Sequence, residues 1–201
     1  MKQVSQEARY RQMMEEPVYT LIPRLAVPTI VSMLVTAVYN MADTYFVSQL
    51  GTSPSAAVGV VFSLMTGIQA VAFMIGMGCG NEIARLLGQK EVEEAERYVA
   101  TGFFTEILVG TLLAVLGIAC SGQLVYRLGA TPTIAPYAAS YTRYALLGVP
   151  FFMCSVGMNN MIRFQGNSFY SMLGIATGGV LNIFLDPLFI YVFHMGIAGA
   201  A

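Results

Sequence analysis

The sequence predicts an all-α membrane protein with five transmembrane helices and the start of a sixth. Two observations carry this prediction. The 201 residues are 56% hydrophobic and 10% charged, with a mean hydropathy of +0.66, whereas soluble domains carry about 25% charged residues. Five segments are also apolar over the ~20 residues that a helix needs to cross ~30 Å of hydrocarbon. We expect these helices at residues 25–47, 56–83, 98–120, 134–162 and 168–193.

Polar segments separate the expected helices and orient them. Residues 1–24 are polar and lack the apolar core of a signal peptide. We expect them to form a cytoplasmic N-terminal segment, followed by a transmembrane lobe over residues 25–201. Only Arg127 and Arg143 then lie outside, and the other eight basic side chains lie inside, as the positive-inside rule requires. The eight are Lys2, Arg9, Arg11, Arg24, Arg85, Lys90, Arg97 and Arg163. The Glu-rich run 91–96 is interpreted as a solvated loop or a helix start.

The C-terminal residues 196–201 are apolar and small, which indicates the beginning of a sixth helix. We therefore expect the chain to continue into a C-terminal lobe that is its partner within the lipid bilayer. The net charge of −1 predicts no nucleic-acid partner, and the three cysteines lack metal-ligand spacing. No cofactor is expected, because Gly76, Gly78 and Gly80 follow no strand and instead predict close helix packing.

Two acids lie inside the expected helices at matched depth. Asp43 shares a helix face with Tyr39 and Asn40, which we expect to line a cavity, and Asp186 shares one with Asn182. Both helices run outward, and at 1.5 Å per residue the carboxyls differ in depth by about 5 Å. Two buried carboxylates repel each other. A proton or Na⁺, held by the oxygens of Asp43, Asn182 and Asp186, would relieve the repulsion. The alternative is a polar patch that holds helices together.

Other residues within the expected helices have functional or structural interpretations. Asn159 is either a functional residue or a partner in an interhelical hydrogen bond, and Gln69 could line a cavity. Glu106 is expected to form an interhelical hydrogen bond or to extend to the interface. Pro28, about four turns before the first acid, can bend its helix and act as a conformational hinge. Tyrosines near helix ends, Tyr141 among them, indicate an aromatic belt.

Several stretches resemble the transporters of the multidrug and toxic compound extrusion (MATE) family, over a region from about residue 25 to the last residue. Three stretches resemble the first two helices of that family, one the fourth helix with its following loop, and two the fifth helix with the start of the sixth. In this order they are 40–47 (NMADTYFV), 57–60 (AVGV), 76–80 (GMGCG), 158–167 (MNNMIRFQGN), 182–190 (NIFLDPLFI) and 196–201 (GIAGAA).

The resemblance implies twelve helices in two six-helix lobes, with most of the first lobe in this chain. It implies a multi-pass protein of the cell membrane that exports organic, often cationic, compounds in exchange for Na⁺ or H⁺. It also implies a cation site at Asp43, Asn182 and Asp186, with Asn159 and Tyr39 near it.

Two other functions remain open. A flippase for lipid-linked sugars, from the same superfamily, should have a more basic central cavity than these helices suggest. An intramembrane aspartyl protease would also use two embedded acids, but its relatives resemble one another in a Tyr-Asp pair and a Gly-x-Gly-Asp motif. Here Asp43 follows Ala42 and Asp186 follows Leu185. The sequence therefore favours a transporter over an enzyme.

Overall fold

The computed structural model describes residues 16–193 and 196–199. Five long helices follow one another, each long and apolar enough to cross a membrane, and the described residues contain no strand. They are α2 (Val18–Ser48), α3 (Thr52–Gly88), α4 (Val92–Arg127), α5 (Ala135–Phe164) and α6 (Ser168–Pro187). The predicted all-α membrane fold is confirmed.

The helices extend beyond the apolar spans from which they were predicted. Helix α2 begins at Val18, seven residues before the expected start, and α4 begins at Val92 rather than near residue 98. The reason is that helical hydrogen bonding continues past the hydrocarbon into polar sequence, which a hydropathy criterion does not register. Residues 1–15 of the expected cytoplasmic segment lie outside the described part of the chain.

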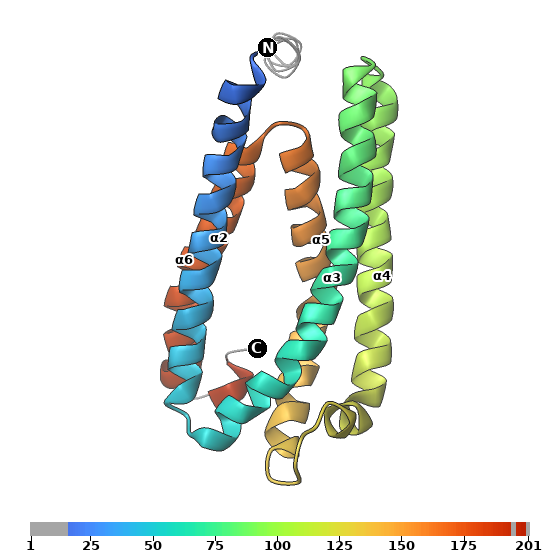
Figure 1. Ribbon diagram of the computed structural model, residues 1–201. Helices are drawn as coiled ribbons and strands as arrows, with labels where there is room; N and C mark the ends of the chain where they lie inside the picture. Colours follow the sequence, from blue (N-terminus) through green and yellow to red (C-terminus); the bar gives the residue numbers. More distant parts are fainter. Residues whose placement is uncertain (1–15, 194–195, 200–201) are drawn as a thin grey trace.

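The five helices form two groups (Figure 1). Helices α3, α4 and α5 pack closely against one another, and α2 packs mainly on α6. The two groups are joined where α2 turns into α3 and where α5 turns into α6. The α3–α4 and α5–α6 connections lie at the same end of the molecule as the start of α2, the end that the count of basic residues assigns to the cytoplasm.

The three-helix group is held together by an apolar core and by glycine contacts. A Cβ added to Gly76 of α3 would lie 2.7 Å from the Cα of Gly157 on α5, so the two backbones touch. This confirms the close packing predicted for Gly76, whereas a Cβ at Gly78 would meet nothing within 4 Å. The central core cluster consists of Ile68, Ala72, Ala114, Leu146, Val149 and Met153.

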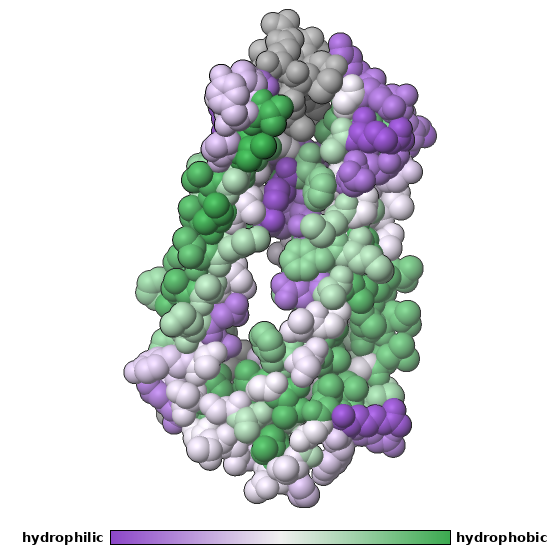
Figure 2. Space-filling model, viewed as in Figure 1, coloured by the Kyte–Doolittle hydropathy of each residue, from purple (hydrophilic) through white to green (hydrophobic). Residues whose placement is uncertain are grey.

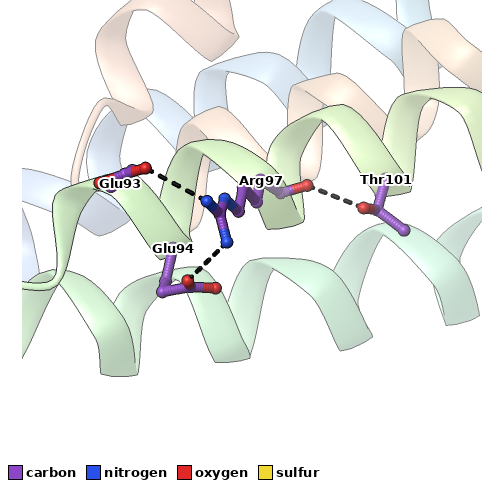
Figure 3. Close-up of polar contacts among 4 residues, drawn as sticks. All are labelled: Glu93, Glu94, Arg97 and Thr101. Carbon is purple, nitrogen blue, oxygen red and sulfur yellow. Dashed lines mark hydrogen bonds and ion pairs between the residues drawn. The ribbon is translucent and has the colours of Figure 1, made fainter.

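The Glu-rich run forms the start of α4. Arg97 lies 3.2 Å from a carboxylate oxygen of Glu93 and 3.0 Å from one of Glu94, and its own carbonyl accepts a hydrogen bond from the Thr101 hydroxyl (Figure 3). Acids in the first turn of a helix interact favourably with its dipole. The run is therefore a solvated helix start, one of the two readings that the sequence allowed.

The outer surface is apolar over most of the helix length. Large side chains such as Leu108, Phe151 and Phe184 are at least 70% exposed, and the hydrophobic residues in Figure 2 cover the flanks of the bundle. Apolar patches of this extent are rare on soluble monomers, and hydrocarbon is the solvent that suits them.

The chain after α6 changes its helical geometry. Pro187 ends α6, and a π-helix, η1 (Leu188–Val192), follows directly. The hydroxyl of Tyr191 lies 3.1 Å from the carbonyl oxygen of Phe46, which connects this segment to the C-terminal end of α2. A 3-10 turn, η2 (Gly196–Ala198), comes next. The last two residues of the expected start of a sixth helix lie outside the described residues.

Candidate functional site

The two acids predicted to act together lie on neighbouring helices. Asp43 is half-buried on α2, and Asp186 is 4% exposed at the end of α6. Both helices run in the same direction and pack along their length (Figure 1). The two carboxyl groups are close enough to interact electrostatically. The side-chain amide of Asn182 donates a 3.0 Å hydrogen bond to Oδ1 of Asp186. The structure therefore brings together the three residues that the sequence predicted as ligands.

Three oxygens of this group point into the protein without a hydrogen-bond donor. They are Oδ1 of Asp43, Oδ1 of Asn182 and Oδ2 of Asp186, and each is buried. Buried acceptors without a donor cost free energy, about 1–3 kcal/mol for a neutral group and more for a charged one. A hard cation or a proton satisfies such oxygens directly. The donor set fits Na⁺ or H⁺, because it contains only oxygens and carries two acidic groups.

A third helix contributes to the same place. Tyr141 on α5 is half-buried, and it interacts electrostatically with both Asp43 and Asp186. The sequence analysis assigned Tyr141 to an aromatic belt, and this assignment is corrected by its position beside the acids. The signal that could have found it is depth, because Tyr141 lies six residues into α5, which starts at the end of the bundle where α2 ends.

The predicted cavity-lining residues differ in where they lie. Tyr39 is half-buried one turn before Asp43 on α2, and its ring packs against Gly179 of α6. Asn40 is exposed, and its carbonyl accepts a hydrogen bond from the Thr44 hydroxyl. Gln69 is half-buried on α3, in the helix group away from the two acids. Figure 2 shows a hollow between the two helix groups, with hydrophilic residues along it.

Asn159 takes part in a separate polar cluster near the other end of the bundle. Its amide donates to the Ser171 carbonyl at 2.9 Å, and its Oδ1 accepts from the Ser171 hydroxyl at 2.7 Å and from Arg163 at 3.2 Å. Ser171 and Asp186 are separated by fifteen residues of α6, or about 22 Å at 1.5 Å per residue. The structure does not bring Asn159 into contact with the acid pair.

The predicted hinge lies in an unbroken helix. Helix α2 passes through both Pro23 and Pro28. Pro28 has no amide hydrogen to donate to the carbonyl four residues before it, which removes one hydrogen bond from the helix. The Ser32 hydroxyl donates a 2.8 Å bond to the Pro28 carbonyl. Bending at this position stays a prediction.

The geometry defines a class of protein: a membrane-embedded helical lobe with a half-buried and a buried acid on two parallel helices, as expected of a membrane transporter. The sequence model of the MatE family matches residues 28–188. The chain belongs to this family, the multidrug and toxic compound extrusion transporters, and its fold matches their N-terminal lobe.

Individual relatives agree with this assignment. A solved MATE structure in the bent conformation superposes with a TM-score of 0.88 at 31% identity, covering 96% of this chain and 43% of its own. The multidrug export protein MepA of Staphylococcus haemolyticus is 24% identical over 188 residues, which are 93% of this chain and 42% of MepA. A FAD transporter of Shewanella oneidensis is 25% identical over 179 residues, with coverages of 89% and 40%. The chain thus spans about two fifths of the length of the proteins that it matches.

Proposed function

We propose that the complete transporter containing this lobe is a secondary antiporter of the cell membrane. It exports organic, often cationic, compounds in exchange for Na⁺ or H⁺, with the N-terminus in the cytoplasm and without a cofactor. The observation that carries the proposal is the set of unpartnered buried oxygens on Asp43, Asn182 and Asp186. The relatives named as multidrug export proteins support the substrate class. Membership of a transporter family also argues against the intramembrane protease.

The acid pair offers a way to couple an ion to movement. A cation from outside that binds between α2 and α6 neutralises the repulsion and draws the two helices together. The same cation must bind less tightly when the lobe has rearranged, because only differential affinity can shift a conformational equilibrium. Pro23 and Pro28 each remove a backbone hydrogen bond from α2, and Pro28 is the one nearer to Asp43, so α2 is expected to bend there. The Tyr141 hydroxyl on α5 would interact differently with the charged and the neutralised pair of acids.

The test is ethidium efflux from cells that express the full-length protein, with Na⁺ and pH varied independently. Asp43→Asn and Asp186→Asn are expected to abolish efflux at normal membrane expression, because each removes a charge that the cation must compensate. The response of the wild type to Na⁺ or to pH identifies the coupling ion. Glu96→Gln, which changes an exposed acid at the start of α4, is the matched control and should leave efflux unchanged. Wild-type efflux in both Asp variants would refute the proposed coupling site.

One observation favours a second candidate, the transport of an anionic compound. Arg163 at the end of α5 is the one basic residue in the described part of the chain that is not exposed, and its Nε is buried without a partner. A lipid-linked sugar or a nucleotide presents phosphate, for which a guanidinium is a suitable partner. Inhibition of ethidium efflux by an anionic compound but not by a cationic one would favour this candidate, provided that the inhibition is lost in Arg163→Gln.

A further inference from the structure

A third acid, Glu106, lies on α4, outside the two helices of the pair, and plays no part in the proposed coupling site. It is on α4, its side chain is 0% exposed, and neither carboxyl oxygen has a hydrogen-bond partner. The sequence analysis expected an interhelical hydrogen bond or extension to the interface, and both expectations are wrong. Glu106 and Asp186 are the two buried acids among the described residues.

The carboxyl occupies a space that glycines provide. A Cβ added to Gly157 of α5 would overlap with Oε1 of Glu106, so the carboxyl rests directly on the α5 backbone. Gly157 is also the residue whose backbone Gly76 of α3 contacts. Glu106 therefore lies where three helices meet, and side chains larger than hydrogen at Gly157 would exclude it.

The groups that face Glu106 are neutral. Its electrostatic partners are two thiols, Cys79 on α3 and Cys154 on α5. No ion pair to Glu106 occurs among the described residues. A nearby polar group, the amide of Asn160, donates to the Val156 carbonyl on its own helix. The carboxyl therefore lacks a compensating positive charge on every helix that packs against it.

An isolated ionised carboxylate in such surroundings is strongly unfavourable, and the group takes up a proton instead. Even the neutral acid leaves its oxygens without partners, which costs about 1–3 kcal/mol. An apolar side chain of the same size would fill the space without that cost. Ionisable groups placed at such expense inside a membrane protein generally have a function.

We propose that Glu106 is a second proton-binding site of this lobe. It holds a proton while α3, α4 and α5 are packed as seen here. It transfers that proton to water, leaving a carboxylate, only when α4 moves away from Gly157 and water reaches the carboxyl. Proton exchange at Glu106 is thereby linked to separation of α4 from α5, independently of the cation held between α2 and α6.

The first test asks whether the proton is present. Infrared spectra of the purified full-length protein near neutral pH should contain the carbonyl band of a protonated carboxylic acid that disappears in Glu106→Gln. The band must persist in the control Glu96→Gln, which changes an exposed acid. Glu106→Met, an apolar residue of similar size, provides a second variant should Gln disturb folding, and it must also lack the band. Spectra that are identical in wild type and both Glu106 variants overturn the proposal.

The second test asks whether the proton is exchanged, and it rests on the proposed efflux activity. A rate controlled by one exchanging proton changes by up to about tenfold per pH unit. The slope of log efflux rate against pH should therefore fall by up to about 1 in Glu106→Gln. An unchanged slope in a variant that has lost the infrared band overturns the proposal, because the proton is then permanent. Failure of the coupling-site variants, Asp43→Asn and Asp186→Asn, to alter efflux would count against the proposed function and leave the infrared result at Glu106 standing.

Discussion

The contact between α2 and α6 beside the acid pair can be tested by a single methyl group. A Cβ added to Gly179 would lie 2.9 Å from Cδ1 of Tyr39 and 3.1 Å from a methyl carbon of Val35. Carbon atoms normally approach to about 3.5–4.0 Å. Gly179→Ala therefore requires the Tyr39 ring, the Val35 side chain or the two helices themselves to shift by about 0.5–1 Å, one turn before Asn182. The neighbouring Gly178 has nothing within 4 Å of the same added atom, so Gly178→Ala is a matched control.

The difference between the two variants isolates the cost of the clash. Both replacements gain about 1 kcal/mol of helix propensity, because alanine is a better helix former than glycine. Gly179→Ala alone also overpacks the α2–α6 contact, which costs about 1–3 kcal/mol. The helix-propensity contribution cancels in the comparison. Gly179→Ala should thus be less stable than Gly178→Ala by about 1–3 kcal/mol, while Gly178→Ala should match or exceed the wild type.

The assay is thermal unfolding of the full-length protein in detergent, followed by ethidium efflux and by titration with the coupling cation. If the clash destabilises only the cation-bound state, in which α2 and α6 are paired, its energy of about 1–3 kcal/mol reduces the affinity for the cation by about 5–150-fold. Gly178→Ala should keep wild-type affinity. Equal stability and equal cation affinity in the two alanine variants would refute the packing of α2 on α6 described here.

Two further predictions concern other helix contacts, and both are checked by thermal unfolding of the full-length protein. Tyr191→Phe removes the hydroxyl that lies 3.1 Å from the Phe46 carbonyl. This variant should lower the free energy of unfolding by about 0.5–1.5 kcal/mol. An unchanged unfolding transition would mean that this bond contributes nothing to stability. Gly76→Ala places a methyl group 2.7 Å from the backbone of Gly157. This variant should be less stable than the control Gly78→Ala by about 1–3 kcal/mol. Equal unfolding transitions of the two variants would contradict the backbone contact.

The sequence predicted the number and order of the helices because hydropathy depends on local composition. It also predicted the group formed by Asp43, Asn182 and Asp186, because helix direction and rise fix the depth of each residue. The ends of α2 and α4 were less well predicted, since hydrocarbon thickness limits the apolar span and not the helix. The same depth argument could have placed Tyr141 beside this group of residues.

Lateral placement could not be predicted in the same way. The depth of Asn159 follows from the helix rise and already separates this residue from the acids, but its bond to Ser171 depends on how α5 pairs with α6. Glu106 was misread because the residues that face it lie on other helices. Its burial depends on Gly157, a residue on another helix with no local sequence link to Glu106. Which helix faces lie opposite each other is a property of tertiary packing, and periodicity within one helix does not contain it.

The pairing of α2 with α6 also has a consequence for how the lobe is made. Helices α3, α4 and α5 are consecutive in the chain, so each can pack on its predecessor soon after it enters the bilayer. Helix α2 enters before them, but its main partner enters after them. During synthesis Asp43 is therefore in the membrane before Asp186 and Asn182 are present, and an acid without polar partners in a membrane is unfavourable. Of the described helices, α6 is therefore the one that completes the proposed ion site, and a chain whose synthesis stops before α6 would contain the three-helix group and an Asp43 without its partners.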